Sequence, residues 1–313
     1  MATAGGAGSV PPARGAVAPL NGERSYLLAI SFLRQIRQAV EQLNPNELRA
    51  AAERRVIVEL SAASLADYAR IEQFLAPLSV SDNRRRQALQ YVYRGEEGNT
   101  QPDLRIVAAG QPAPAGAFIF DPYAPEMLVQ QVVTARDDLA LALARAFPPF
   151  RQAVVDKTVF AVSKENALFA LATAVPDILP GLSLPWALPQ AASDTAILTV
   201  NQIRMAFLLA AASDRPVGYS EQRTEIGGII AGAFGWRALA RELIGKIPAG
   251  GGLIPKAGIA FAATFVEGLS LDRLYRVGYG YTRHERQEAY GAALERGKQV
   301  AAVLWERIRP RQR

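Results

Sequence analysis

Residues 55–60 read RVIVEL, a run of strand length in which three of six residues are β-branched. Such residues favour strands. Helical spacing returns from Ser64 to Leu75, and Pro77 ends it. Strand, loop and helix in this order are the unit from which parallel α/β sheets are built. This stretch therefore predicts the fold class of the first half of the chain.

The flanking segments extend the same alternation. Spacings of three and four apolar residues predict helices, and short β-branched or aromatic runs predict strands. The predicted elements are helices over 25–43, 47–54, 82–93 and 125–147, and strands over 104–108 and 117–120. We therefore expect a small α/β layer with a mainly parallel sheet over 25–150. Residues 1–24, rich in Ala, Gly and Pro, predict a disordered leader.

Strand signals stop after Phe150. Apolar periodicity predicts only helices beyond it, over 152–174, 194–212, 221–247, 256–277 and 282–308. Four prolines between residues 176 and 189 interrupt the chain after the first of these, and Thr282 with Glu285 forms a capping box at the last. The fold class is therefore α+β, a small α/β layer followed by an all-α domain over 151–313.

Composition excludes several kinds of chemistry. The 313 residues include no cysteine and a single histidine, His284. Disulfides, thiolate nucleophiles and Fe–S clusters are therefore excluded, as is a His-rich zinc site. No glycine-rich loop leads to Lys and Ser/Thr, the pattern that cradles phosphates. We expect no enzyme, no cofactor and no metal.

The net charge of +6 gathers at the C-terminal end. Residues 273–313 contain ten Lys/Arg and four acids, so they carry the whole excess. A basic tail suits anionic lipid head groups or nucleic acid, and a solvated helix face is the alternative. We do not expect nucleic acid, because the nearby tyrosines lie in helices, where Tyr is more often part of the core.

A membrane-spanning helix needs about 20 predominantly apolar residues. Prolines interrupt the longest uncharged stretch, and Arg204, Lys256 and Glu267 cut others, so no independent span is predicted. Two features still favour a membrane. Gly228 and Gly232 form a GxxxG pair, which lets helix backbones approach closely, and residues 257–266 are apolar except for Thr264. Tight packing inside a soluble bundle explains both equally well.

One acid stands out. Asp177 lies between Pro176 and Pro180 in apolar surroundings. Its side chain suits a helix N-cap, and a buried carboxylate there would need a partner such as Arg204.

Several short stretches carry a resemblance to a known family. They are residues 174–177 (AVPD), 201–205 (NQIRM), 241–248 (RELIGKIP) and 260–264 (AFAAT). In this order they resemble the YcjF-type, GTPase-associated domain of unknown function. The resemblance implies a helical, often membrane-associated domain attached to or encoded beside Era-like GTPases, with no known enzymatic residue. The candidate structural or partner-contact residues are Asp177, Gln202, Arg204, Gly228, Gly232, Lys256 and Thr264.

The first half has a related interpretation. Its strand, loop and helix over 55–75 resemble a GTPase domain that has lost nucleotide binding, because the loop over 60–64 has no Gly or Lys. We expect a non-enzymatic, membrane-associated accessory protein on the cytoplasmic side, with a GTPase partner or self-association. The alternative is a soluble, cytoplasmic helical scaffold or homo-oligomerisation module.

Overall fold

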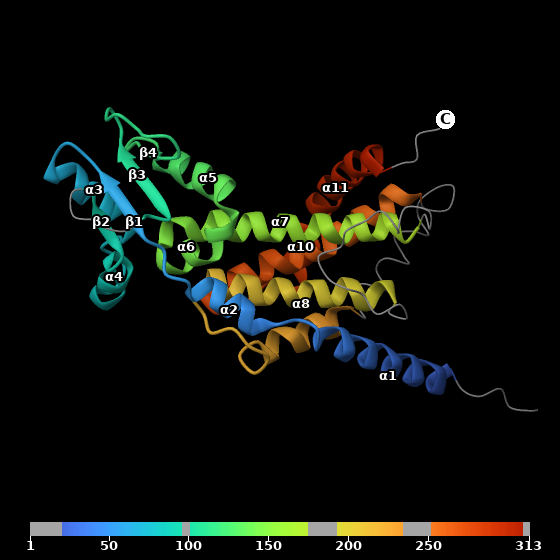
Figure 1. The fold of residues 1–313 in the computed structure, drawn as a ribbon. Coiled ribbons are helices and arrows are strands. Elements are labelled where there is room, and N and C mark those ends of the chain that lie inside the picture. Colours follow the sequence, from blue (N-terminus) through green and yellow to red (C-terminus); the bar gives the residue numbers. More distant parts are fainter. Residues whose placement is uncertain (1–20, 96–100, 175–192, 234–251, 309–313) are drawn as a thin grey trace, which may run out of the picture.

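The computed structural model describes residues 21–95, 101–174, 193–233 and 252–308, with side chains described from residue 30 onward. It confirms the α+β class. A small parallel sheet in the first half is followed, in the described part of the second half, by helices alone (Figure 1). Asp177 lies outside the described residues, as do residues 1–20 of the leader predicted over 1–24 and residues 234–247 of the helix predicted over 221–247. Residues 21–24, which were assigned to the leader, are helical and begin the first helix.

The sheet has four parallel strands in the order β2-β1-β3-β4. They are β1 (Val58–Ser61), β2 (Val92–Arg94), β3 (Leu104–Ala108) and β4 (Phe118–Phe120). The run that predicted the first strand forms β1, in the middle of the sheet, with Val58 and Leu60 fully buried. Helix α3 (Leu65–Leu75) follows, and the Ser64 side chain caps it by accepting from the Asp67 amide at 3.2 Å.

Two predicted helices of this half were wrong in part. Residues 92–94 form β2, and only α4 (Asp82–Leu89) is helical. The strand depends on pairing with β1, where Val58 lies opposite Val92. The helix over 125–147 is broken into α5 (Pro125–Ala135), the turn η1 (Asp137–Leu139) and α6 (Ala140–Ala146). At the break Arg136 leaves the helical conformation, and its guanidinium binds both Asp138 oxygens, at 2.9 and 3.0 Å.

Prolines begin helices here. The first two are α1 (Asn21–Val40) and α2 (Pro45–Glu53). Pro45 is the first residue of α2, and Asn44 caps that helix by accepting from the Asn46 amide at 3.2 Å. Pro148 and Pro149 likewise open α7 (Pro148–Ala172). Proline suits the first turn because amides there have no partner within the helix.

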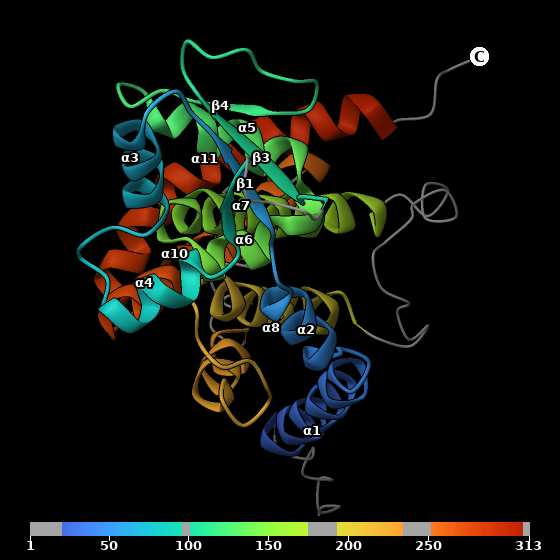
Figure 2. The ribbon, with the colours of Figure 1, turned by 60° about the vertical axis from the view of Figure 1, so that its left-hand side comes forward.

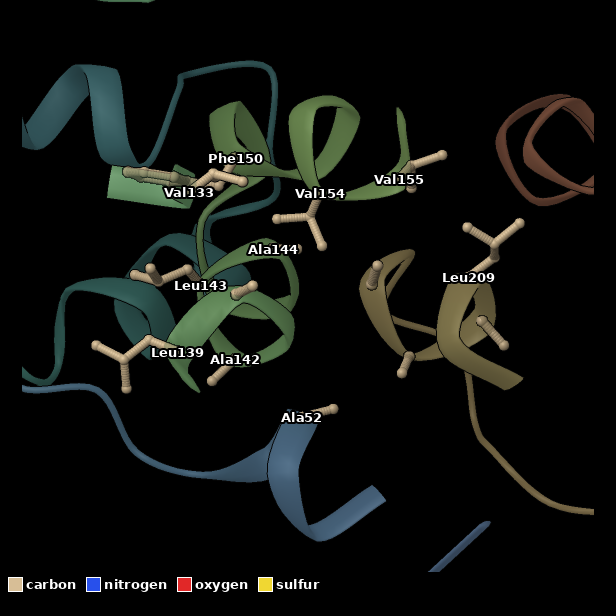
Figure 3. Packing of buried hydrophobic residues seen from close by; sticks show 14 of the residues in the cluster. Ala52, Val133, Leu139, Ala142, Leu143, Ala144, Phe150, Val154, Val155 and Leu209 are labelled. Atoms are coloured by element: carbon tan, nitrogen blue, oxygen red, sulfur yellow. The ribbon is translucent and has the colours of Figure 1, made fainter. Parts of the chain in front are cut away.

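The second half contains α8 (Asp194–Ala212), a helix over 223–233, α10 (Leu253–Val277) and α11 (Arg283–Ile308). Helix α10 packs against α7, α8 and α11. Helix α7 begins before residue 150, where the domain boundary was predicted, and continues past it. It also contacts α5 and α6 of the first half. One core joins both halves. Figure 3 shows part of this shared core, which includes Ala52 of α2, Leu143 of α6, Val154 of α7 and Leu209 of α8.

Close helix packing depends on glycines other than the predicted pair. A Cβ atom at Gly297 of α11 would lie 2.7 Å from the Gly258 carbonyl oxygen of α10, and one at Gly268 would lie 2.6 Å from a Val159 methyl of α7. At Gly228 and Gly232 no described atom lies within 4 Å of such a Cβ. No described helix therefore approaches the face of the helix over 223–233 that carries these glycines, and the close approach of a helix there stays a prediction.

The expectation that no helix could span a membrane needs correction. Helices α8 and α10 are each long and apolar enough to do so, because an 18-residue stretch of each holds at most two charged residues. However, 78% of that stretch in α8 and 67% in α10 is buried inside the fold. Core helices of soluble proteins meet the same criteria of length and composition.

Candidate functional site between three helices

Three of the residues singled out from the sequence line one pocket. Gln202 on α8 and Lys256 and Thr264 on α10 surround a cavity of about 260 Å³, called here the interhelical pocket. Its other lining residues are Phe169 and Ala170 of α7, Asp194, Thr195, Leu198 and Thr199 of α8, Ile259, Ala260 and Ala263 of α10, and Ala233. Figure 2 shows α7, α8 and α10 side by side, and they contact one another in pairs (Figure 2).

Helical spacing brings these residues to one face. The α8 members follow one another at intervals of one, three, one and three residues from Asp194 to Gln202, and those of α10 are spaced similarly. Residues three and four apart share a helix face. Most of the lining side chains are apolar, and the chain is too rich in apolar residues for this spacing alone to mark a pocket.

Polar side chains form a connected row beside the pocket. This polar seam consists of Glu165 and Asn166 of α7, Asn201, Gln202 and Arg204 of α8, and Thr264 of α10. Within it Thr264 Oγ1 accepts from Asn166 Nδ2 at 2.7 Å and from Gln202 Nε2 at 3.3 Å. Asn166 Oδ1 accepts from Asn201 Nδ2 at 2.7 Å. Because the four uncharged side chains are buried, these bonds select one relative placement of the three helices.

At one end of the polar seam, Arg204 binds the carboxylate of Glu165. Its Nε donates to Asn201 Oδ1 at 3.0 Å, and its guanidinium forms an ion pair with Glu165. Burial lowers the pKa of Arg204 from its ordinary value, and Glu165 opposes that shift. Among the described residues, Glu165 is therefore a counter-ion of Arg204.

An ion pair lies at the pocket. Lys256 Nζ lies 3.2 Å from Asp194 Oδ2 and 3.4 Å from Thr173 Oγ1. Both ionic side chains are nearly half exposed, so water or a ligand can reach them. Asp194 begins α8, and Ser193 caps that helix by accepting from the Ala196 amide at 3.4 Å.

The pocket provides binding groups. Its lining offers an amide, three hydroxyls and one ion pair in otherwise apolar walls. Within the described ranges, no group of three or more His, Asp or Glu side chains is placed to hold a metal ion. His284 is exposed on α11, where its Nδ1 lies 3.5 Å from Glu288 Oε2.

The remaining sequence candidates lie elsewhere. Gly228 and Gly232 are absent from the lining, although Ala233, next in the same helix, contributes to it. Sequence reasoning did not identify Glu165 as a member of the site. It also did not predict the contact between Asn166 and Asn201, although Asn201 lies in one of the stretches that resemble the YcjF-type domain. Amides at buried helix positions were the available signal.

Much of the basic C-terminal region is neutralised internally. Arg273 pairs with Glu285, and Arg286 with Glu267. Two further pairs are Arg276 with Asp272 at 3.1 Å and Lys298 with Glu295 at 2.7 Å. The Arg296 guanidinium lies over the rings of Phe160 and Phe265, 4.9 and 5.0 Å from their centroids. These side chains serve helix packing, which leaves less free charge than the composition suggests.

No protein-family model, curated protein or solved structure matches this chain.

Proposed function

We propose that the protein is a non-enzymatic, membrane-associated accessory protein whose interhelical pocket binds the apolar chain of an anionic amphiphile. The observation that carries this proposal is the lining of the pocket. Apolar side chains such as Phe169, Leu198 and Ile259 form most of it, and the Lys256–Asp194 ion pair is within a ligand's reach.

The volume suits one chain. An engineered apolar cavity of about 150 Å³ binds benzene, and typical ligand pockets begin at about 300 Å³. At about 260 Å³ the pocket has room for a short chain or one end of a longer one. Each buried methylene contributes about 0.8 kcal/mol, so a few of them outweigh the loss of ordered water at the polar groups.

The ion pair supports an anionic head group. Lys256 is nearly half exposed and is shared with Asp194 and Thr173. A carboxylate or phosphate at the pocket would compete with Asp194 for the ammonium group. Binding should therefore be stronger for an anionic amphiphile than for a neutral one of the same chain length.

Binding of dodecanoate, measured by calorimetry, tests the pocket. Ala263→Phe places a ring in the lining and should weaken binding at least about tenfold, a loss of about 1.4 kcal/mol. Ala292→Phe is the matched control, the same exchange at an exposed position of α11, and should leave binding unchanged. Equal affinity in both variants, each with a native-like unfolding transition, would exclude the pocket as the binding site.

Membrane association has a separate test. Cell fractions and vesicle sedimentation should find the protein with the membranes. The apolar lengths of α8 and α10 support this result. Full recovery in the soluble fraction without detergent would contradict it, whatever the outcome of dodecanoate binding.

The burial of α8 and α10 favours a second candidate, a soluble helical scaffold. Most of their apolar surface is covered within the fold, so no lipid is needed to cover it. A monodisperse, detergent-independent species in light scattering would support this candidate. A GTPase partner stays a prediction that rests on the sequence resemblance.

A further inference from the structure

A second cavity, of about 410 Å³, is lined by six arginines and is called here the arginine pocket. It lies between the end of α2, helix α4 and the junction of α6 with α7. Figure 1 shows these elements near the left-hand end of α7. Its arginines are Arg54, Arg55, Arg84, Arg85, Arg145 and Arg151, and its only acids among the described lining residues are Glu53 and Asp214. It shares no described lining residue with the interhelical pocket.

Three of the arginines have carboxylate partners. Arg54 lies 2.7 Å from Asp103, which is outside the lining. Arg84 and Arg145 share Asp214, with Arg145 Nε 3.6 Å from Asp214 Oδ1. These contacts consume most of the negative charge near the pocket.

The other three arginines have no carboxylate partner among the described residues. The Arg55 guanidinium lies over the Tyr91 ring, 5.4 Å from its centroid. Arg85 Nε donates to the Ala76 carbonyl at 3.1 Å, and Arg151 Nε approaches the Ala144 carbonyl at 3.4 Å. Each of these contacts uses one nitrogen or one face of the guanidinium group. The remaining N–H groups can therefore bind an anion.

Arg151 is partly buried. Burial lowers the pKa of Arg151 from its ordinary value, and the charges of Arg84 and Arg145 lower it too, against the opposite effect of Asp214. Arg151 is also the fourth residue of α7, a 25-residue helix with no side-chain cap at its start. The positive end of the helix dipole therefore adds to the local field. An anion would relieve this concentration of positive charge.

Asp214 already acts as an internal anion. It has a left-handed backbone, with φ of 57°, and it is the only described non-glycine residue with positive φ. That conformation costs an ordinary L-residue about 1–2 kcal/mol. Its Oδ1 atom is buried without a hydrogen bond, as is Ser213 Oγ. The fold thus places a carboxylate in a left-handed backbone conformation among arginines, and its buried Oδ1 atom has only the longer ion-pair contact with Arg145.

We propose that the arginine pocket binds a small molecule carrying phosphate groups, with Arg55, Arg85 and Arg151 as the phosphate ligands. The N–H groups of one guanidinium can bind two phosphate oxygens at once. Asp214 is already paired with Arg84 and Arg145, so the guanidinium groups of the other three arginines are available for a phosphate. The cavity is larger than a single phosphate ion, so the rest of the ligand or a second phosphate fits beside the first. The pocket is next to Val56 and Tyr91, which precede β1 and β2. It is therefore at the amino ends of these strands, away from the β1–α3 loop where a GTPase would bind its nucleotide.

Calorimetric titration with pyrophosphate tests the pocket on the full chain. Arg85→Gln and Arg151→Gln should each weaken binding at least about tenfold, since a charge-assisted hydrogen bond contributes about 1.5–3 kcal/mol. The matched control is Arg86→Gln, which removes the same charge from the next residue of α4. Arg86 does not line this pocket, so the control should lose less than about threefold. Arg55→Gln, at an exposed position, repeats the test without disturbing the core.

Asp214→Asn gives a prediction of opposite sign. Asparagine tolerates the left-handed conformation, and the change removes the competing negative charge. Pyrophosphate should therefore bind several-fold more tightly. Undetectable binding to the wild type, equal losses in the Arg85 and Arg86 variants, or weaker binding by Asp214→Asn would each overturn the proposal.

Two further arms identify the source of the phosphate. Phosphatidylcholine vesicles with phosphatidic acid should bind in an Arg151-dependent way if the phosphate belongs to a lipid head group. If only soluble phosphates respond to Arg151→Gln, the ligand is a free metabolite. Tight binding of a polynucleotide that falls equally in the Arg85 and Arg86 variants would replace the pocket with a diffuse basic surface.

Discussion

The crossing of α10 and α11 allows a test in which one substitution has opposite effects at two positions of the same helix. A Cβ at Gly297 would lie 2.7 Å from the Gly258 carbonyl oxygen and 3.0 Å from Phe261 Cβ. The first contact is with backbone, so only a shift of the helix relieves it. Overpacking of this kind costs about 1–3 kcal/mol. Alanine recovers about 0.5–1 kcal/mol of helix propensity, so Gly297→Ala should destabilise the protein by about 1–2 kcal/mol.

Gly291 is the matched control. It is exposed on the same helix, and no described atom lies within 4 Å of a Cβ placed there. Gly291→Ala should therefore keep the propensity gain and stabilise the protein by about 0.5–1 kcal/mol. Urea unfolding followed by circular dichroism measures both variants. The reasoning is refuted if Gly297→Ala is as stable as the wild type or if the two variants change stability in the same direction.

The remaining predictions concern Gly228, the polar seam and the capping box. Gly228→Ala should stabilise the protein by up to about 1 kcal/mol. If thermal unfolding shows instead that the variant is destabilised by more than about 1 kcal/mol, the result would support the close approach of helices predicted at this glycine. Thr264→Val should cost about 2–3 kcal/mol, because the Asn166 amide and a second buried donor lose their acceptor. Thr264→Ser keeps the hydroxyl and should cost only about 1 kcal/mol; equal losses would show that packing alone matters. Hydrogen bonding to Arg273, and to the backbone and hydroxyl of the capping box, lowers the pKa of Glu285 from 4.5 to about 2. Because the folded pKa is the lower one, this stabilisation is complete above pH 4.5 and is lost as the pH falls through about 2. The unfolding midpoints of the wild type and Glu285→Gln should therefore converge over that interval, and a constant difference would contradict the shift.

Elements with local signals at their ends were predictable. Ser64 and Ser193 cap α3 and α8 where the sequence placed those helices, and Thr282 exchanges hydrogen bonds with Glu285 at the start of α11. A cap depends on residues three positions apart, so a single segment contains the information.

Elements that depend on distant partners were not predictable. Residues 92–94 have no strong strand signal and become β2 because β1, over 30 residues earlier, offers free ladder groups. The break at Arg136 likewise involves Asp103, which lies near the start of β3 and accepts from the arginine through its carbonyl oxygen. Neither interaction can be seen in a local window of sequence.

The same division applies to the site. The sequence identified Gln202, Arg204, Lys256 and Thr264 as unusual residues in apolar helices, and three of them meet at the interhelical pocket.

By itself, the sequence determined the helices whose ends carry caps, the α+β class and the lack of cysteine chemistry, because caps, breakers and composition act over a few residues. Only the tertiary structure decided that Glu165 pairs with Arg204, that Gly297 lies against Gly258, and that six arginines from the segment after α2 and from α4, α6 and α7 surround one cavity. These groups come from parts of the chain that are tens of residues apart. Their energies arise from burial and from distance in space, which the order of residues does not specify.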